Sequence, residues 1–256
     1  MTGRAGYIIG LTALSVVAAL LLPAVPQPVE YHDFADHRTL LGVANFLDVA
    51  SNLGFLLAGI AGIAVTFRSR TGFEADSERW PYAVFFAGML LTAAGSAYYH
   101  LVPGNERLFW DRLPMTVAFM SLLAAQVVDR FSVRAGLALL LPLLVVGAAS
   151  VLYWRATERA GAGNLVPYAM LQAYAVVVLL LIARQPSRYT RGNDLYWVFA
   201  GYVIAKVFET LDREFLAAGN LVSGHTLKHL AAAVAGWVVC RMLVLRRPIV
   251  AASRRG

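Results

Sequence analysis

The feature that most constrains this chain is a series of eight long apolar runs separated by short polar stretches. A helix needs about 20 mostly apolar residues to cross the hydrocarbon core of a bilayer, because each residue advances it by only about 1.5 Å. We expect transmembrane helices at residues 5–25, 45–67, 81–101, 111–130, 133–152, 165–183, 194–210 and 223–245. The sequence therefore predicts an all-α polytopic membrane helix bundle.

Composition supports this class and excludes others. The chain is 59% hydrophobic and 14% charged, whereas soluble proteins are about 45–50% apolar and about 25% charged. Its one cysteine excludes an intramolecular disulfide and a cysteine-rich metal site, so a metal would need nitrogen and oxygen ligands. The net charge of +7 comes from residues between the apolar runs and at the C-terminus. We expect no nucleic-acid binding, because there is no basic surface interleaved with aromatic residues.

The first apolar run has two readings. A basic start, MTGR, followed by apolar residues is also typical of a secretory signal peptide. The run is long for a signal peptide, and the following AVPQPVE offers a poor cleavage site, so a retained helix is favoured. The sequence then predicts an N-terminal transmembrane helix and linker at 1–29, a seven-helix membrane domain at 30–246 and a basic tail at 247–256.

The arginines are divided unequally between the two sides of the predicted membrane. Eight spans place both termini on one side, and that side holds fourteen of the twenty arginines. Cytoplasmic segments carry the excess of basic residues, so both termini are expected in the cytoplasm. A composition rich in arginine, alanine, leucine and valine is typical of a GC-rich bacterial genome. We therefore expect a multi-pass protein of a bacterial inner membrane.

Three of the five histidines lie at the ends of apolar runs. His225 and His229, in SGHTLKHL, are four residues apart, so they lie one turn apart on one helical face and can share a metal ion. His100 closes another run, in GSAYYHL. The predicted topology brings all three to one depth, near the non-cytoplasmic face. Ionisable groups are costly inside a bilayer, so their presence indicates a functional site.

The chemistry of this cluster points to hydrolysis. Three imidazoles with an open fourth position are typical of a catalytic zinc (Zn2+) site, which activates water. Ser96 lies one helical turn before His100, and Asp111 opens the next run in WDRLPMT. A carboxylate can take the proton of the attacking water, and a hydroxyl can donate to the oxyanion that forms at a carbonyl. The residues predict metal-assisted cleavage of an ester or amide that arrives from the lipid bilayer.

These motifs, taken together, resemble those of the alkaline ceramidase family. That family belongs to a superfamily of seven-helix membrane hydrolases that includes the adiponectin receptors. The shared pattern is Ser96–x3–His100, then Asp111 in WDRLPM, then His225–x3–His229, in the family's order and spacing. The resemblance extends over most of the chain and implies the seven-helix fold of the family.

The resemblance also implies roles for the residues of the cluster. The three histidines would bind zinc, Asp111 would accept a proton, and Ser96 would help hold the water or stabilise the oxyanion. The implied reaction is the hydrolysis of a ceramide-like N-acyl lipid to a free fatty acid and a long-chain amine base. The partner is then a membrane lipid.

Relatives in eukaryotes carry a calcium (Ca2+) site just before the first core helix. Asp33 and Asp36, in YHDFADHR, lie where acidic ligands fall in those relatives. A later acidic position reads Asn45 here, with Asp48 close by. The resemblance thus implies a calcium or structural site at these four residues, with one acidic ligand replaced by an amide.

The remaining polar residues are expected to be structural. Lys206 and Glu209 are spaced i, i+3 and should pair, because each alone would be costly in lipid. Lys228 is expected to extend toward the outer interface. His32 and His37 are expected to be ordinary water-facing residues rather than ligands.

Two other functions remain open. A receptor or sensor of the same superfamily would hold zinc structurally and bind a lipid without turning it over. Asp111 and Ser96 argue against it, because a structural site needs neither a base nor an oxyanion donor. A transporter or proton relay would use the histidines and the Lys206–Glu209 pair without a metal. Metal content distinguishes this last function from the other two.

Overall fold

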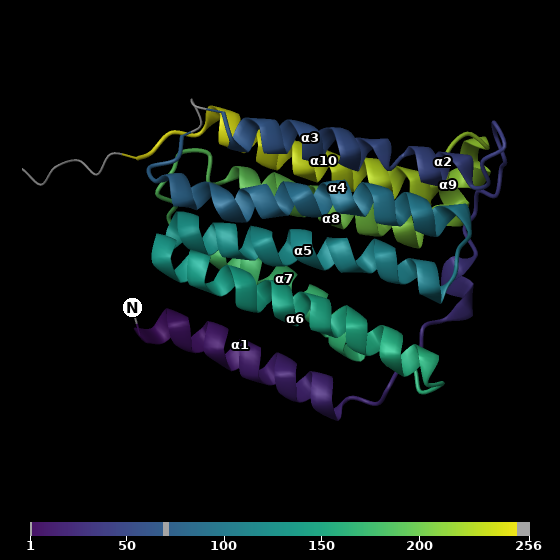
Figure 1. The fold of residues 1–256 in the computed structure, drawn as a ribbon, viewed down its shortest axis with the longest axis horizontal. Coiled ribbons are helices and arrows are strands. Elements are labelled where there is room, and N and C mark those ends of the chain that lie inside the picture. The colour runs from purple at the N-terminus through teal and green to yellow at the C-terminus, as the bar shows by residue number, and fades with distance from the viewer. Residues whose placement is uncertain (1, 69–71, 250–256) are drawn as a thin grey trace, which may run out of the picture.

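The computed structural model describes residues 2–68 and 72–249, with side chains from Gly10 onward, and shows helices lying along a common axis (Figure 1). The long helices in this part of the chain are α1 (Thr2–Leu21), α3 (Leu53–Thr66), α4 (Arg79–Leu101), α5 (Asn105–Arg130), α6 (Val133–Arg159), α7 (Val166–Ala183), α8 (Asp194–Thr210) and α10 (Gly224–Leu245). The short elements are α2 (Phe46–Ala50), α9 (Asp212–Gly219) and two 3-10 turns at Val29–His32 and Asp76–Glu78. The predicted all-α helix bundle is confirmed.

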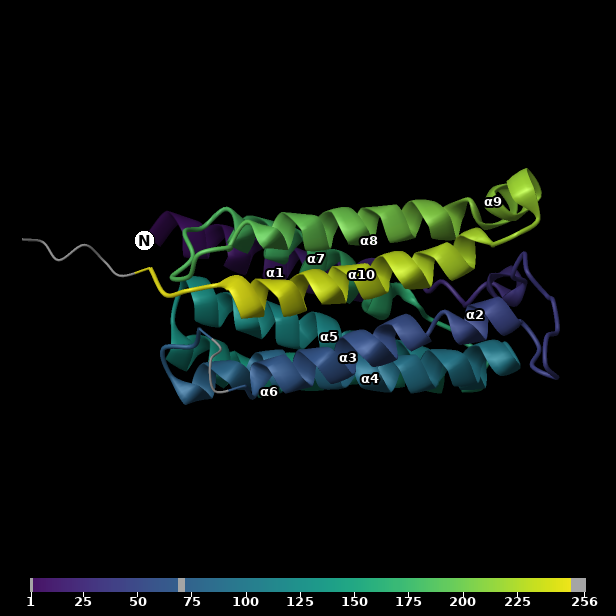
Figure 2. The ribbon, with the colours of Figure 1, turned by 90° about the horizontal axis from the view of Figure 1, so that it is seen from above.

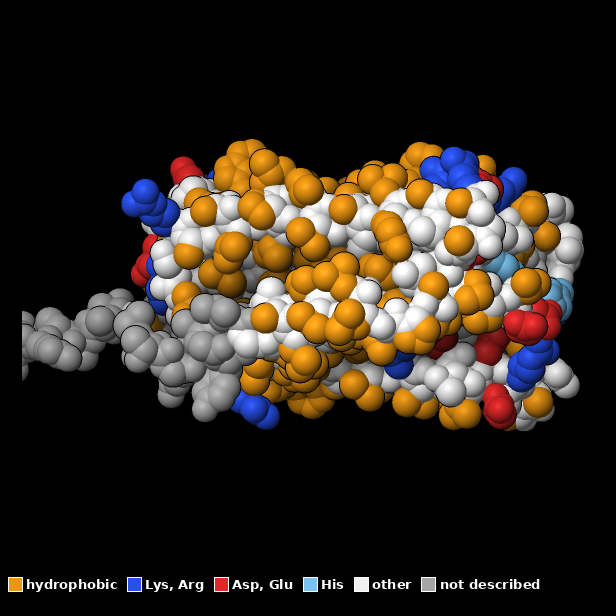
Figure 3. All heavy atoms as spheres, turned by 90° about the horizontal axis from the view of Figure 1, so that it is seen from below, with side chains coloured by type: hydrophobic (Ala, Val, Ile, Leu, Met, Phe, Trp, Pro, Cys, Tyr) orange, Lys and Arg blue, Asp and Glu red, His pale blue; other side chains and the backbone are white. Residues whose placement is uncertain are grey.

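Six elements of the described chain are long and apolar enough to cross a membrane. They are Phe46–Thr66 (α2 with α3), Asp76–Leu101, Asn105–Arg130, Val133–Arg159, Val166–Ala183 and Gly224–Leu245. Helix α8, with 17 residues, is just shorter and packs along α10, while α1 packs against α7 (Figure 2). Figure 3 shows charged side chains at both ends of the molecule and a hydrophobic surface between them. The chain is therefore a multi-pass membrane protein.

The two ends of the bundle are distinguished by the helix ends and the side chains that lie there. At one end, here called the histidine end, α4 and α8 finish while α5 and α10 begin (Figure 1). At the opposite end, here called the arginine end, the side chain of Arg246 is fully buried and pairs with Asp129 at 2.8 Å. The guanidinium also lies 4.2 Å from the ring centroid of Tyr189. These contacts hold the C-terminus of α10 against α5 and the loop after α7.

The tail that follows α10 begins as an ordered segment. The backbone of Thr190 donates to the carbonyl of Arg247, and that of Ile249 donates to the carbonyl of Arg188, at 2.9 and 2.8 Å. Residues 250–256 of the predicted basic tail lie outside the described residues.

Helices α5 and α6 extend farther at the histidine end than their apolar runs predict. Helix α5 begins at Asn105 rather than at residue 111, and α6 ends at Arg159 rather than at residue 152. Glu106, in the first turn of α5, pairs with Arg155 and Arg159 of α6 at 2.8 and 2.6 Å. These charged turns stay helical because they pair with each other, which hydropathy alone does not reveal.

The start of α10 is fixed by two residues that precede the histidine pair. The Ser223 hydroxyl accepts a hydrogen bond from the Thr226 backbone N–H at 3.1 Å, as an N-cap residue does. At Gly224, an added Cβ would lie 2.2 Å from the carbonyl oxygen of Phe208, so only glycine allows this approach to α8. The cap and the glycine together set the direction in which His225 points.

Candidate metal centre

Three histidines converge at the histidine end of the bundle. His100 lies in the last turn of α4, and His225 and His229 lie in the first two turns of α10. Their ring centroids are 4.8, 4.9 and 4.9 Å apart. Their candidate ligand atoms all lie within 4.8 Å of one another, and all three residues are buried. The cluster expected from sequence is confirmed, and it could hold a metal ion.

The hydrogen bonding of these rings fits a metal site. His100 Nδ1 and His225 Nε2 are buried and have no hydrogen-bond partner. Buried polar side-chain atoms are nearly always satisfied, so each exception calls for an explanation such as a bound ion. Imidazole nitrogen is a good ligand for zinc and for other transition metals. Within the described chain, no other group of three or more His, Cys, Asp or Glu residues offers such a site.

Ser51 orients His229 and was not predicted from the sequence. Its hydroxyl lies 2.8 Å from His229 Nδ1 and donates its own proton to the Asp48 carbonyl at 3.0 Å. Because that proton is used, the hydroxyl oxygen accepts from Nδ1–H, which leaves Nε2 of His229 free to bind a metal. The signal available in the sequence was a polar group, Asp48, Ser51 and Asn52, inside an otherwise apolar run.

Ser96 and Asp111 meet across the contact between α4 and α5. The Ser96 side chain is a hydrogen-bond partner of the Asp111 carboxylate, which is also subject to the charge of Lys228. Ser96 is 1% exposed and lies one turn before His100 on the same helical face. The structure thus brings the predicted base and the predicted oxyanion donor together, next to a histidine of the cluster.

A glycine and a proline allow this meeting. Pro114, inside α5, has no N–H to donate to the Trp110 carbonyl one turn earlier. Gly95 of α4 packs against that same carbonyl, since an added Cβ would lie 1.9 Å from the Trp110 oxygen. Gly95 immediately precedes Ser96, and Trp110 immediately precedes Asp111. The close approach therefore sets the spacing of the Ser96–Asp111 pair.

We expect Gly95→Ala to lower the hydrolysis predicted from the sequence by about 100-fold, because a displacement near 1 Å at a reacting group costs about that much. The new methyl group would push α4 from α5 and separate Ser96 from Asp111, with about 1–3 kcal/mol of destabilisation from overpacking. Turnover and the unfolding midpoint should be measured on the same preparation. Gly104→Ala is the matched control, since nothing lies within 4 Å of a Cβ at that position in the neighbouring loop. Equal activity of the two variants would show that the close contact does not position the pair.

A segment before α2 crosses the histidine end and covers the cluster. This segment, residues 25–39, is here called the strap. It is fixed by hydrogen bonds from Leu165 N to the Val25 carbonyl at 2.7 Å and from Ala35 N to Asp212 at 2.9 Å. Phe34, which is 3% exposed, places its ring centroid 4.6 Å from that of His100 and 4.3 Å from that of His225. The strap thus shields the imidazoles from water on one side.

Each of the four residues expected to bind calcium makes contacts with other groups of the protein. The oxygens of Asp36 accept from Nε and Nη2 of Arg38 at 2.8 and 2.5 Å, and Asp33 accepts from Arg213 at 2.6 Å. The two remaining residues make other contacts: Asn45 donates to the His100 carbonyl at 2.8 Å, and Asp48 accepts from Thr226 Oγ1 at 2.6 Å. Arginines therefore neutralise two of the three carboxylates that were expected to bind calcium, Asp36 and Asp33.

The Asp36–Arg38 pair also anchors the strap. The hydrogen bond from Arg38 lowers the pKa of the Asp36 carboxyl, so the pair stays charged at neutral pH. Arg38 donates further to the carbonyls of Asn220 and Leu221, at 3.0 and 2.7 Å. Because the folded pKa is lowered, this contribution to stability is present above the ordinary aspartate pKa and is lost as pH falls below it.

A group of paired charges lies beside the cluster. Lys206 pairs with Glu209 as predicted, and Lys228 also pairs with Glu209, at 2.8 Å. The prediction that Lys228 extends to the interface is wrong, since its side chain is only 18% exposed. An unpaired charge near the membrane would be costly, which favours the pairing of both lysines with Glu209.

The two other histidines do not join the metal centre. His32 lies 2.8 Å from the Tyr99 hydroxyl and 2.9 Å from the Asn105 side-chain oxygen, so it ties the strap to α4 and α5. His37 is exposed and lies 3.3 Å from Asp33. His32 thus links helices to the strap and is not the ordinary water-facing residue that was expected, whereas His37 is water-facing as expected.

Comparisons with known proteins do not identify a family for this chain. A scan against models of protein families finds no match. A search of curated proteins finds no chain similar to this one. The function is therefore inferred from the chemistry of the site.

Proposed function

We propose that this chain is a zinc-dependent hydrolase that cleaves the N-acyl amide bond of a ceramide-like lipid, releasing a free fatty acid and a long-chain amine. The observation that supports this most is the Ser96–Asp111 pair, which lies one helical turn before His100, one of three buried histidines that could share one metal ion. A site that only stabilised the fold would need ligands, but neither a base nor an oxyanion donor. The hydrophobic surface on the face shown in Figure 3 supports a substrate that arrives from the bilayer.

Each residue of the site has a chemical task in this proposal. A bound zinc ion supplies the positive charge that polarises a carbonyl and makes water more acidic. Asp111 takes a proton from the attacking water and returns it to the nitrogen as the C–N bond breaks. The Ser96 hydroxyl donates to the ionised Asp111 carboxylate and holds it in place. Once Asp111 carries the proton from water it can donate to the Ser96 oxygen, and the Ser96 proton then turns to the oxyanion. The new C–O bond makes the fatty acid, and the protonated nitrogen leaves as the amine.

Helix packing supports access from the lipid phase. Helix α7 packs against α1, α5 and α6, whereas α8 packs against α10 and α9. Among the described residues, α7 and α8 therefore pack mainly on different neighbours, and direct contact between them holds this side of the bundle only weakly. We propose that lipid substrates approach there, with the histidine end on the non-cytoplasmic side of a bacterial inner membrane and both termini in the cytoplasm. The excess of arginines at the opposite end supports this orientation.

The test is fatty-acid release from an N-acyl long-chain amine by the purified protein in a neutral detergent. We expect turnover in the zinc-loaded protein, loss of turnover to background on chelation, and recovery when zinc is added back. Release that continues unchanged after complete metal removal would contradict a zinc hydrolase. Tight binding of the lipid with no release by the zinc-loaded protein would instead identify a receptor or sensor.

A further inference from the structure

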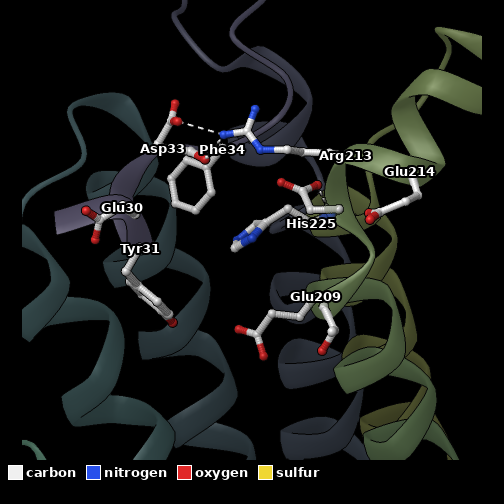
Figure 4. Close-up of a pocket in the computed structure, with 10 residues that line it drawn as sticks. Glu30, Tyr31, Asp33, Phe34, Glu209, Arg213, Glu214 and His225 are labelled. Carbon is white, nitrogen blue, oxygen red and sulfur yellow. Dashed lines mark hydrogen bonds and ion pairs between the residues drawn. The ribbon is translucent and has the colours of Figure 1, made fainter. Parts of the chain in front are cut away.

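Two hollows in the described part of the chain differ sharply in their lining. The one beside the metal centre is lined mostly by charged side chains, among them the paired Asp33 and Arg213 (Figure 4). The other has a volume of about 350 Å3 and lies between Leu91–Tyr98 of α4 and Trp110–Val117 of α5. It is here called the α4–α5 groove, and its lining is apolar and aromatic.

The α4–α5 groove forms where small side chains meet across two helices that lie side by side (Figure 1). Its lining residues recur at i, i+3, i+4 and i+7 on each helix, which places them along one stripe of each. Ala94, Gly95 and Pro114 have little bulk, and larger side chains flank them at both ends. The groove therefore extends over about two helical turns, or about 10 Å.

The groove faces outward from the bundle rather than toward the metal centre. Leu91, Tyr98 and Trp110 are 58, 44 and 49% exposed, so no described segment of the chain covers it. His100 is buried and follows Tyr98 by two residues, which places it about 200° farther around α4. Both helices are long and apolar enough to cross a membrane, so the natural cover of the groove is a lipid chain.

An arginine lies at the end of the groove that is nearest the histidine end. Arg107, in the first turn of α5, holds its guanidinium 4.4 Å from the ring centroid of Tyr98 and donates to the Tyr98 carbonyl at 3.3 Å. Among the described residues no carboxylate lies within 4.0 Å of it, and the neighbouring Glu106 pairs with arginines of α6 instead. The charge of Arg107 is thus held in position without being neutralised.

We propose that the α4–α5 groove binds an anionic phospholipid, with one acyl chain in the groove and the phosphate on Arg107. A guanidinium binds phosphate through charge-assisted hydrogen bonds, and basic groups beside membrane helices are typical sites for lipid head groups. Tyr98 and Trp110 lie between chain and head group, where amphipathic rings are favoured in a membrane. A zwitterionic lipid fits less well, because it brings a cation of its own to Arg107.

This lipid is distinct from the substrate of the proposed hydrolysis, and the site does not depend on that function. A ceramide-like lipid has no phosphate, and its amide bond must reach the metal centre, whereas the groove lies on another face of α4. The bound chain would pack against Gly95 and Trp110, the two residues whose contact sets the spacing of the Ser96–Asp111 pair. The groove thereby connects the composition of the membrane with the pairing of α4 and α5.

The test is fluorescence quenching by lipids with brominated chains, because Trp110 lines the groove. The full chain is placed in phosphatidylcholine vesicles with brominated phosphatidylglycerol, or brominated phosphatidylcholine, as the same minor fraction. The signal of Trp110 is the difference between each protein and the same protein with Trp110→Phe. We expect phosphatidylglycerol to occupy the groove about 3- to 5-fold more strongly, as for one exposed ion pair. High salt should reduce this preference.

Two variants separate the head group from the chain. Arg107→Gln should make quenching by the two brominated lipids equal. Ala94→Phe fills the floor of the groove and should lower quenching of Trp110 by both lipids. Arg213→Gln is the matched control for Arg107→Gln, because it removes the same charge from α9 at the same end of the bundle and should keep the preference.

Three results would overturn the assignment. One is equal quenching of the wild type by the two brominated lipids. Another is a preference for phosphatidylglycerol that survives in Arg107→Gln, since the head group would then be recognised elsewhere. The third is stronger quenching by a brominated N-acyl long-chain amine than by brominated phosphatidylglycerol, which would identify the groove as a site for the chain of the substrate.

Discussion

Replacement of Asp111 by asparagine is expected to lower fatty-acid release by about 100- to 10,000-fold, the range over which a positioned general base acts. The amide keeps the shape of the side chain and can still bond to Ser96, but it cannot take a proton from water. The three histidines are untouched, so the metal should stay bound. Turnover and metal per chain should be measured on one preparation.

Glu106→Gln is the matched control for this variant. Glu106 is a carboxylate of the same helix, α5, and it pairs with arginines of α6 outside the metal centre. Its loss should leave turnover close to that of the wild type. Wild-type turnover in Asp111→Asn, with zinc retained, would show that another group is the base.

His225→Ala should have the largest effect, because it removes one of three candidate metal ligands. Loss of a group that only orients a metal ligand weakens metal binding by about 10–100-fold, so loss of the ligand itself should exceed that range. Helix α10 should still form, since the Ser223 cap and Gly224 are retained. We expect the purified variant to lack stoichiometric zinc and to release no fatty acid, while its helix content stays that of the wild type.

Hydropathy was sufficient to locate the helices because membrane spans are set mainly by the length of apolar runs. The run at 194–210 is an example, since α8 occupies Asp194–Thr210 despite its charged residues. Features that depend on contacts between helices were not predicted. The run at 45–67 is divided into α2 and α3, and the amphipathic α9 was not expected at all.

The histidine cluster could be predicted from sequence because two independent rules agreed. The i, i+4 spacing placed His225 and His229 on one face, and the count of spans placed His100 at the same depth. Asp111 and Ser96 followed from their distances along the chain to these histidines.

The residues that orient the cluster could not be predicted in the same way. Ser51 bonds to His229 across 178 positions of sequence, and the Gly95–Trp110 contact depends on a carbonyl that Pro114 leaves free. Such contacts arise from the packing of one helix on another, and no spacing rule describes them. The arginines that pair with Asp33 and Asp36 were missed for a similar reason, since Arg213 joins the strap from a distant segment.

The claim that three histidines hold a catalytic metal is tested most directly by the zinc content of the purified wild type beside His225→Ala. The exposed His37→Ala serves as the control, because it removes an imidazole that lies outside the cluster. We predict one zinc ion per chain in the wild type and in His37→Ala, and no stoichiometric zinc in His225→Ala. A wild type that binds no metal after growth and purification with zinc, or a His225→Ala variant that keeps a full equivalent, would contradict the account.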